Sequence, residues 1–146
     1  MVAQSTTKRF EELLEKHQLK KTTARLNVLS TMYGKKSATS QPELESVLQD
    51  IDRVTLYRIL NVFEEKGIIH KVFDLNGTAN YAVCSSGCEE HHHHDEHLHF
   101  NCKVCKSVFC LNDMSLPNIK LPAGFRAEGF TLYASGLCPS CSSKKA

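Results

Sequence analysis

The sequence has no tryptophan and no long apolar run, and its formal net charge at neutral pH is only +2. No stretch approaches the roughly 20 apolar residues that a membrane-spanning helix needs. The first residues, MVAQS, also lack the apolar core of a signal peptide. These absences favour a cytoplasmic protein with no membrane partner. The small net charge gives little support for nucleic-acid binding, so that function would have to come from the arrangement of particular residues.

Cysteine, in contrast, is plentiful: the chain has seven, and four of them form two Cys-x-x-Cys pairs, Cys102, Cys105, Cys138 and Cys141. In a reducing cytosol, such pairs bind metal more often than they form disulfides. Four thiolates complete the shell of a structural zinc and leave no open position for catalysis. The ion would contribute on the order of 10 kcal/mol to folding, in a C-terminal segment that can bury only a small core. We therefore expect one structural zinc per protomer rather than buried or disulfide-bonded cysteines.

A second set of candidate ligands lies outside these pairs. His97 and His99 alternate with apolar residues, so on a strand both would leave the same face. His70 lies near the start of a predicted β-hairpin, Cys84 follows its returning strand, and the turn at 76–77 brings the two together. These four residues could form a His₃Cys tetrahedron, which suits zinc better than Mg²⁺ or Mn²⁺. From the residues alone, His70 could equally be a surface histidine and Cys84 a small core residue.

The N-terminal half has the pattern of a winged helix. Apolar spacing predicts helices over 6–17, 22–33, 41–48 and 52–67, followed by strands at 68–73 and 80–83 around an Asn-Gly turn. Helices followed by a β-hairpin are typical of this relative of the helix-turn-helix. In the fourth helix Thr55, Tyr57 and Arg58 are side chains suited to reading a DNA major groove. The helix could also be an ordinary amphipathic one with a solvated face.

The composition changes after Cys84. Residues 85–96 are polar and read as a loop, and short strands are predicted at 98–101, 107–111 and 125–133. Pro117 and Pro122 leave little room for a long helix between the last two strands. We therefore place a domain boundary near residue 84.

The sequence resembles the ferric uptake regulator family of metal-dependent, dimeric transcriptional repressors over about residues 6–141. The motifs that carry the resemblance are KKTTARL at 20–26, TLYRIL at 55–60, GII at 67–69, HxHxxCxxC at 97–105 and the last Cys-x-x-Cys. The resemblance implies an α+β fold, with a winged-helix DNA-binding domain at residues 1–84 and a small α/β dimerisation domain at residues 85–146 that holds the Cys₄ zinc. It also implies a homodimer on double-stranded operator DNA. The DNA-binding residues we expect are Lys20, Arg25, Thr55, Tyr57 and Arg58.

Within the family, the hinge site is similar to that of the zinc uptake regulators, which have a cysteine at the position of Cys84. The resemblance thus implies a regulatory site of His70, Cys84, His97 and His99 that binds a second metal ion, zinc. Leu98 and Pro117 replace ligands of a further family site, which we expect to be absent. The roles of Cys88, His91 to His94 and Cys110 stay open; Cys110 could be a ligand, a neighbour of the site or a buried residue.

We predict a zinc-responsive repressor that binds palindromic operator DNA when the hinge site is filled. The alternatives are an iron- or peroxide-responsive regulator of the same family and a zinc-stabilised protein-interaction module. An enzyme is not expected. A zinc deaminase has Pro before its Cys-x-x-Cys, whereas Asn101 precedes Cys102 here and a second pair closes the site.

Overall fold

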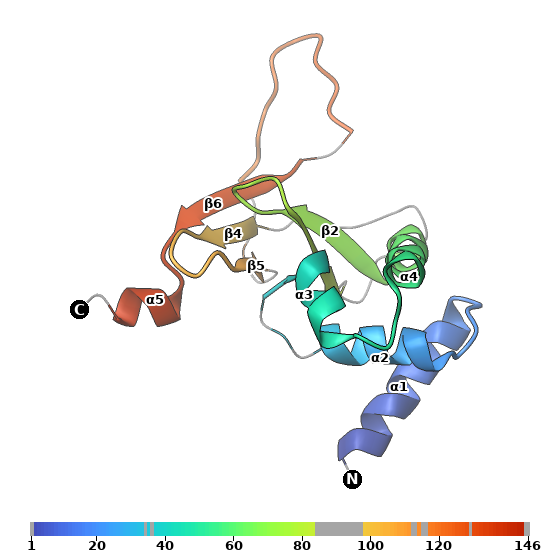
Figure 1. Cartoon of the computed structure of the whole chain (residues 1–146). Helices are drawn as coiled ribbons and strands as arrows, with labels where there is room; N and C mark the ends of the chain where they lie inside the picture. Colours follow the sequence, from blue (N-terminus) through green and yellow to red (C-terminus); the bar gives the residue numbers. More distant parts are fainter. Residues whose placement is uncertain are drawn as a thin grey trace.

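The computed structural model describes residues 2–33, 35, 37–83, 98–111, 114, 117–128 and 130–144 (Figure 1). Helices and a small sheet form the N-terminal half, and a second sheet with a short helix follows. The elements are α1 Val2–Lys16, α2 Thr23–Met32, β1 Thr39–Ser40, α3 Gln41–Val47, α4 Arg53–Glu65, β2 Ile69–Phe73, β3 Ala79–Val83, β4 Leu98–Cys102, β5 Val108–Leu111, β6 Leu132–Gly136 and α5 Pro139–Ser143. The α+β fold predicted from the sequence is confirmed. No helix in these ranges is long and apolar enough to cross a membrane.

Local side-chain caps explain where the helices begin. Thr22, Ser40 and Asp52 precede α2, α3 and α4, and each accepts a hydrogen bond from the backbone N–H three residues further on. Gly67, with φ of 76°, follows the end of α4 in the left-handed conformation that glycine adopts without strain. The four helices predicted from the sequence are therefore confirmed, with α1 beginning before residue 6.

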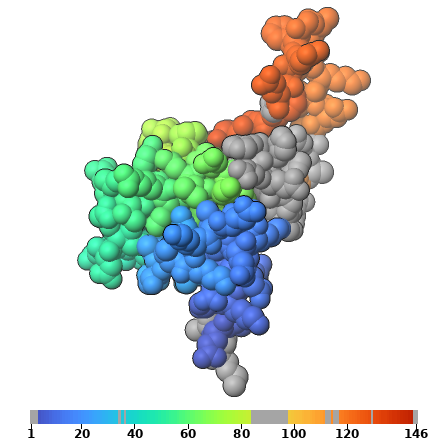
Figure 2. Space-filling view, turned by 90° about the vertical axis from the view of Figure 1, so that its right-hand side faces the viewer, coloured from blue at the N-terminus to red at the C-terminus, as the bar shows by residue number. Residues whose placement is uncertain are grey.

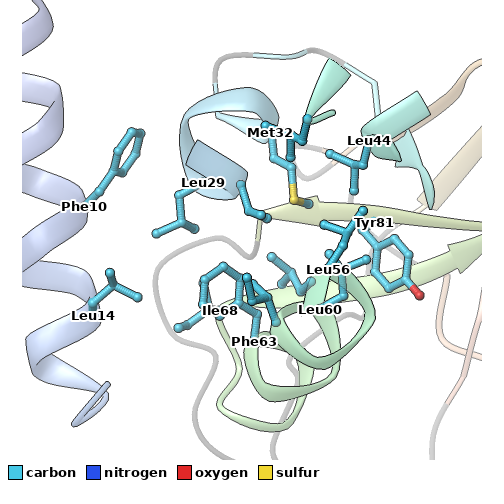
Figure 3. Close-up of a cluster of buried hydrophobic side chains, with 14 residues drawn as sticks. Phe10, Leu14, Leu29, Met32, Leu44, Leu56, Leu60, Phe63, Ile68 and Tyr81 are labelled. Carbon is cyan, nitrogen blue, oxygen red and sulfur yellow. The ribbon is translucent and has the colours of Figure 1, made fainter. Parts of the chain in front are cut away.

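The main hydrophobic core lies between the four N-terminal helices and the first sheet (Figure 3). The apolar stripe of α4 contributes four fully or nearly fully buried side chains, Leu56, Ile59, Leu60 and Phe63. They meet Phe10 and Leu14 of α1 and Leu29 of α2. Burial of this stripe fixes which face of α4 points outward.

The wing is a three-stranded antiparallel sheet in the order β1-β3-β2. At its turn, the Asp74 carboxylate accepts from the N–H groups of Asn76 and Thr78, and Gly77 has φ of 78°. Strand alternation sends Ile69 of β2 into the main core. His70 and Val72, two residues apart, share a face of β2, and Val72 packs there in a separate small cluster.

The second sheet has the order β5-β4-β6 and packs beside the wing. β4 is antiparallel to β5 and parallel to β6. The apolar part of the contact with the wing is formed by Ala38, Val72 and Val108, with Ala82 packed against them. The Ala38 N–H donates to the Val108 carbonyl at 2.7 Å. This contact carries β4 and β5 to the face of the wing from which Val72 projects.

Two elements differ from the sequence expectation. The strand predicted over 125–133 begins only at Leu132, so that boundary was wrong. Residues 117–128 instead form an exposed loop that extends away from the body (Figures 1 and 2). Pro117 and Pro122 lack a donor N–H, and Gly124 has φ of 91°, so this stretch is poorly suited to a strand ladder. Helix α5, which starts at Pro139 directly after Cys138, was not predicted.

Candidate metal centres and nucleic-acid interface

The four paired cysteines meet at one point. Cys102 ends β4, Cys105 lies in the following turn, and Cys138 and Cys141 lie before and within α5. Their Sγ atoms all lie within 4.8 Å of one another, and the distance from Cys105 Sγ to Cys138 Sγ is 3.9 Å. Zinc bound at 2.3 Å in a tetrahedron separates its sulfurs by about 3.8 Å. None of the four cysteines forms a disulfide, so the donor set fits a zinc ion.

The environment of Cys102 favours the ligating form of its thiol. The Cys138 N–H donates to Cys102 Sγ at 3.4 Å, and this bond is the main cause that lowers the pKa of Cys102 to about 6. The contact with Cys138 raises the pKa of Cys141 to about 12. Backbone donors thus stabilise negative charge on one sulfur, and metal binding requires all four sulfurs as thiolates.

A second cluster joins the two sheets. His70 Nε2 of β2 lies 3.4 Å from Cys110 Sγ of β5, and the ring centroids of His70 and His99 are 5.9 Å apart. One ligand atom from each of these three residues lies within 4.8 Å of the others. Zinc bound to an imidazole and a thiolate would hold nitrogen and sulfur about 3.6 Å apart. The three side chains are therefore arranged as metal ligands could be.

Strand register places this cluster. His99 on β4 is directly opposite Cys110 on β5 and Tyr133 on β6. The His99 and Tyr133 rings pack with centroids 5.5 Å apart. His70 and His99 are only 4% and 2% exposed. Burial among strands keeps both rings in place.

The structure tests the predicted hinge ligands only in part. It brings His70 and His99 together, while Cys84 and His97 lie outside the described residues, as do Cys88 and His91 to His94. The four-ligand site therefore stays a prediction. Cys110 joins the cluster, although the sequence left its role open. Its place could have been found by pairing 98–101 with 108–111 around the first Cys-x-x-Cys turn, which sets His99 against Cys110.

Helix α4 presents a mixed polar and aromatic face to solvent. Tyr57 is 53% exposed, and Val54 and Arg58 beside it are exposed as well. Thr55 is half-buried, and its hydroxyl donates to the Asp52 carboxylate. That bond is the main cause that lowers the pKa of Asp52. Thr55 thus contributes to the cap, whereas Tyr57 and Arg58 are available to a ligand.

The two remaining predicted DNA-binding residues lie at the start of α2. Lys20 is exposed, and Arg25 is half-buried. The Arg25 guanidinium donates to the Lys20 carbonyl at 3.0 Å. Arg25 therefore holds the turn that exposes Lys20.

A winged helix beside a Cys₄ cluster and a His–Cys cluster has the parts of a metal-responsive, DNA-binding regulator. The model of the ferric uptake regulator family matches residues 16–135, and the chain belongs to this family. Its members are metal-responsive transcription regulators.

Solved structures of the family share the fold. A zinc uptake regulator in complex with zinc and DNA matches with a TM-score of 0.69 and 21% identity, covering 99% of this chain and 98% of the other. The Vibrio cholerae ferric uptake regulator matches with a TM-score of 0.59 and 21% identity, covering 87% and 98%. A zinc-bound manganese uptake regulator matches with a TM-score of 0.58 and 20% identity, covering 88% and 98%. A search of curated proteins gave no match.

Proposed function

We propose that this protein is a cytoplasmic, homodimeric, zinc-responsive repressor that binds palindromic operator DNA when its hinge site is filled. The observation that carries the proposal is the cluster of His70, His99 and Cys110, because its ligands come from both sides of the contact between wing and second sheet. Cys84 and His97, predicted ligands of the same site, flank the ends of β3 and β4 in the sequence.

The donor set supports zinc as the sensed metal. Imidazole and thiolate suit zinc, whereas carboxylate and water suit Mn²⁺ and Mg²⁺. Cys110 adds a sulfur to the one predicted at Cys84, which makes the site softer still. This argues against the iron- or peroxide-responsive alternative. The choice of zinc comes from the donor atoms and not from the related structures, because regulators named for zinc, iron and manganese all have a similar fold.

The mechanism follows from which elements the ligands join. His70 is on the wing, next to α4 in the chain, and His99 and Cys110 are on the second sheet. Ligands held together across this contact fix α4 relative to the second sheet. In a dimer this sets the distance between two recognition helices, which must match the half-site spacing of the DNA. Zinc then favours the DNA-competent arrangement through its higher affinity for it, and DNA tightens zinc binding by the same factor.

The test compares His99→Ala with a control, His17→Ala, whose histidine lies just after α1 and outside the cluster. Binding is measured by fluorescence anisotropy on a DNA selected from random sequence by the zinc-loaded protein. We expect His99→Ala to retain the zinc of the Cys₄ site and to lose zinc-stimulated DNA binding, and Cys84→Ser to behave alike. His17→Ala should respond as the wild type does. A His99→Ala protein with wild-type zinc dependence would refute the role of the hinge site.

A further inference from the structure

We propose that one bound water molecule joins the turn of the wing to the Cys-x-x-Cys turn that follows β4, and that the buried side chain of Asn101 holds this water. The link gives the wing a second point of attachment to the second sheet. It uses no residue of the hinge cluster formed by His70, His99 and Cys110, and it does not depend on the proposed function.

Asn101 is a buried polar side chain at an inward position of β4. It lies two residues after His99, so both side chains leave the same face of the strand, toward the wing. Its partner on β5 is Val108, which packs against Val72 of the wing. Asn101 is only 2% exposed, and its Oδ1 atom has no hydrogen-bond partner among the described residues. Leaving such an atom unpaired is costly, and buried polar atoms are nearly always bonded to protein or to ordered water.

A small cavity of about 10 Å³ lies between Asn101 and the turn of the wing. Two segments of the chain line it, the wing turn with Asp74, Leu75 and Asn76, and the Cys-x-x-Cys turn with Asn101, Cys102 and Lys106. The turn between β2 and β3 reaches the second sheet at this point (Figure 1). A water molecule needs roughly 10–15 Å³. The cavity therefore has room for one water and not for a larger ligand.

The polar groups around the cavity suit a water molecule. The Asp74 carboxylate accepts hydrogen bonds from the backbone N–H groups of Asn76 and Thr78, and its remaining lone pairs can accept another. Asp74 and the Oδ1 atom of Asn101 are both acceptors, so they cannot bond to each other. A water molecule has two O–H donors and can bond to both at once. A cation would also be attracted by two acceptors, but Lys106 in the lining adds positive charge that disfavours it.

Backbone hydrogen bonds hold the other wall of the cavity in place. The Cys102 N–H donates to the Ser107 carbonyl at 3.0 Å, and the Lys106 N–H donates to the Cys102 carbonyl at 3.1 Å. Lys106 has φ of 64°, a left-handed conformation that residues other than glycine rarely adopt. Asn101 directly precedes Cys102, a member of the Cys₄ cluster. A bridging water therefore makes the position of the wing turn depend on the turn that contains two of the four cysteines.

The first experiment measures hydrogen exchange in the zinc-loaded full-length chain and compares Asn101→Val with Asn101→Thr. The two new side chains have nearly the same shape, but only threonine has a hydroxyl that can bond to the water. Asn101→Val should accelerate exchange of the Asn76 and Thr78 amides about fivefold, as expected for loss of one hydrogen bond. Asn101→Thr should accelerate it less. If the Oδ1 atom is simply unpaired, its removal relieves a cost and the valine variant is protected at least as well as the threonine variant. That result overturns the proposal.

Thr39→Val is the matched control. Thr39 is 1% exposed, and its Oγ1 atom also has no hydrogen-bond partner in the described part of the chain, but Thr39 does not line the cavity. It pairs with Tyr81 in the same wing sheet. The substitution should leave exchange at the wing turn unchanged. An acceleration as large as that of Asn101→Val would show a general loosening of the wing and would contradict a specific link.

The second experiment looks for the water directly. A high-resolution crystal structure of the zinc-loaded wild-type chain should contain one ordered water within hydrogen-bonding distance of Asn101 Oδ1 and of the wing turn. No ordered water there, a cation in its place, or a direct bond from a protein group to Oδ1 overturns the proposal.

His99→Ala separates this link from the proposed hinge switch. The variant should lose zinc-stimulated DNA binding, as proposed above, and should keep the wild-type exchange rate at the wing turn. A wing turn that exchanges as fast in His99→Ala as in Asn101→Val would refute a separate link. A zinc response that survives in His99→Ala would count against the hinge switch alone.

Discussion

Cys110 is the residue that most changes the chemistry of the hinge cluster. It places a thiol 3.4 Å from an imidazole nitrogen of His70, on the strand that faces His99. Sulfur at this point favours thiophilic ions such as zinc, and oxygen would favour harder ions. A single substitution at Cys110 should therefore change which metal ion the hinge cluster prefers.

Replacing Cys110 by Asp should weaken zinc binding at the hinge and strengthen Mn²⁺ binding relative to zinc. The loss in zinc affinity should be at least the roughly 10- to 100-fold that removal of an outer-shell partner costs. Competition against a chromophoric chelator measures it, with the Cys₄ site filled. Cys110→Ser should lose zinc affinity without the gain in Mn²⁺. Equal zinc affinity in all three proteins would exclude Cys110 as a ligand.

The ionisation of Asp52 makes the stability of the start of α4 depend on pH. The Thr55 hydroxyl and N–H stabilise its carboxylate, so its pKa is lower in the folded protein than in the unfolded chain. Its stabilising contribution is therefore present above the unfolded pKa of about 3.8 and is lost as pH falls through the folded pKa. Asp52→Asn keeps the cap and should show a smaller fall in urea midpoint between about pH 5 and pH 3. Parallel midpoint curves for both proteins would contradict this assignment.

The sequence predicted most residues of the two clusters and left the role of Cys110 open for a physical reason. The four paired cysteines could be grouped from the sequence because each pair lies within four residues, where local spacing alone sets the geometry. Their convergence in the structure agrees with that expectation. Cys110 and His70 are 40 residues apart, and their contact depends on how one sheet packs on another. Spacing along the chain carries no information about that packing.

At the scale of elements, α4 has one face buried in the main core and another face exposed to solvent. Its four buried apolar residues fix its rotation, and this leaves Tyr57 and Arg58 on the outer surface. The sequence predicted this helix well because the 3.6-residue period and the cap are both local signals. The same rotation gives the helix its proposed role in DNA recognition.

Substituting Tyr57 or Arg58 by Ala should weaken operator binding about tenfold or more, as expected for loss of a contact worth about 1–3 kcal/mol. Zinc uptake should not change, because neither side chain is in a metal cluster. Anisotropy titrations and zinc content measure the two effects. Glu65→Gln at the opposite end of α4 is the control and should bind DNA nearly normally. Wild-type affinity in both alanine variants would count against α4 as the recognition helix.

The region between β5 and β6 shows where prediction of elements failed. The sequence predicted a strand over 125–133, but a strand also needs a partner along its edge, and β4 pairs with β6 only from Leu132 onward. Pairing is a property of the folded sheet. The short helix α5 was missed because five residues carry too little periodic signal.

At the scale of the whole molecule, the two halves are stabilised differently. The N-terminal half has a large core formed by helices and wing. The buried cluster around β4 and α5 consists of Cys102, Cys138 and Cys141, with Phe100 and Phe109 against it. We therefore expect the second half to depend on an ion bound at the Cys₄ cluster far more than the first half does.

Removal of zinc from the Cys₄ site by a strong chelator should unfold the second sheet and leave the winged helix folded. Hydrogen exchange should become fast in β4, β5 and β6, while the buried part of α4 stays protected. Re-addition of zinc should restore protection. Equal loss of protection in α4 and β4 would show that the two halves unfold as one unit.

Among the described residues, the apolar part of the contact between wing and second sheet consists of short side chains, those of Ala38, Val72, Val108 and Ala82. The hydrogen bond from Ala38 to Val108 and the contact of His70 with Cys110 lie beside it. Short side chains bury little apolar surface, so an ion bound by His70, His99 and Cys110 would add a large share of the free energy that holds the two sheets together. A large, closely packed interface between the two sheets would keep the same angle whether or not a single ion is bound. With a small apolar contact, we expect the angle of this joint to depend on whether the ion is bound.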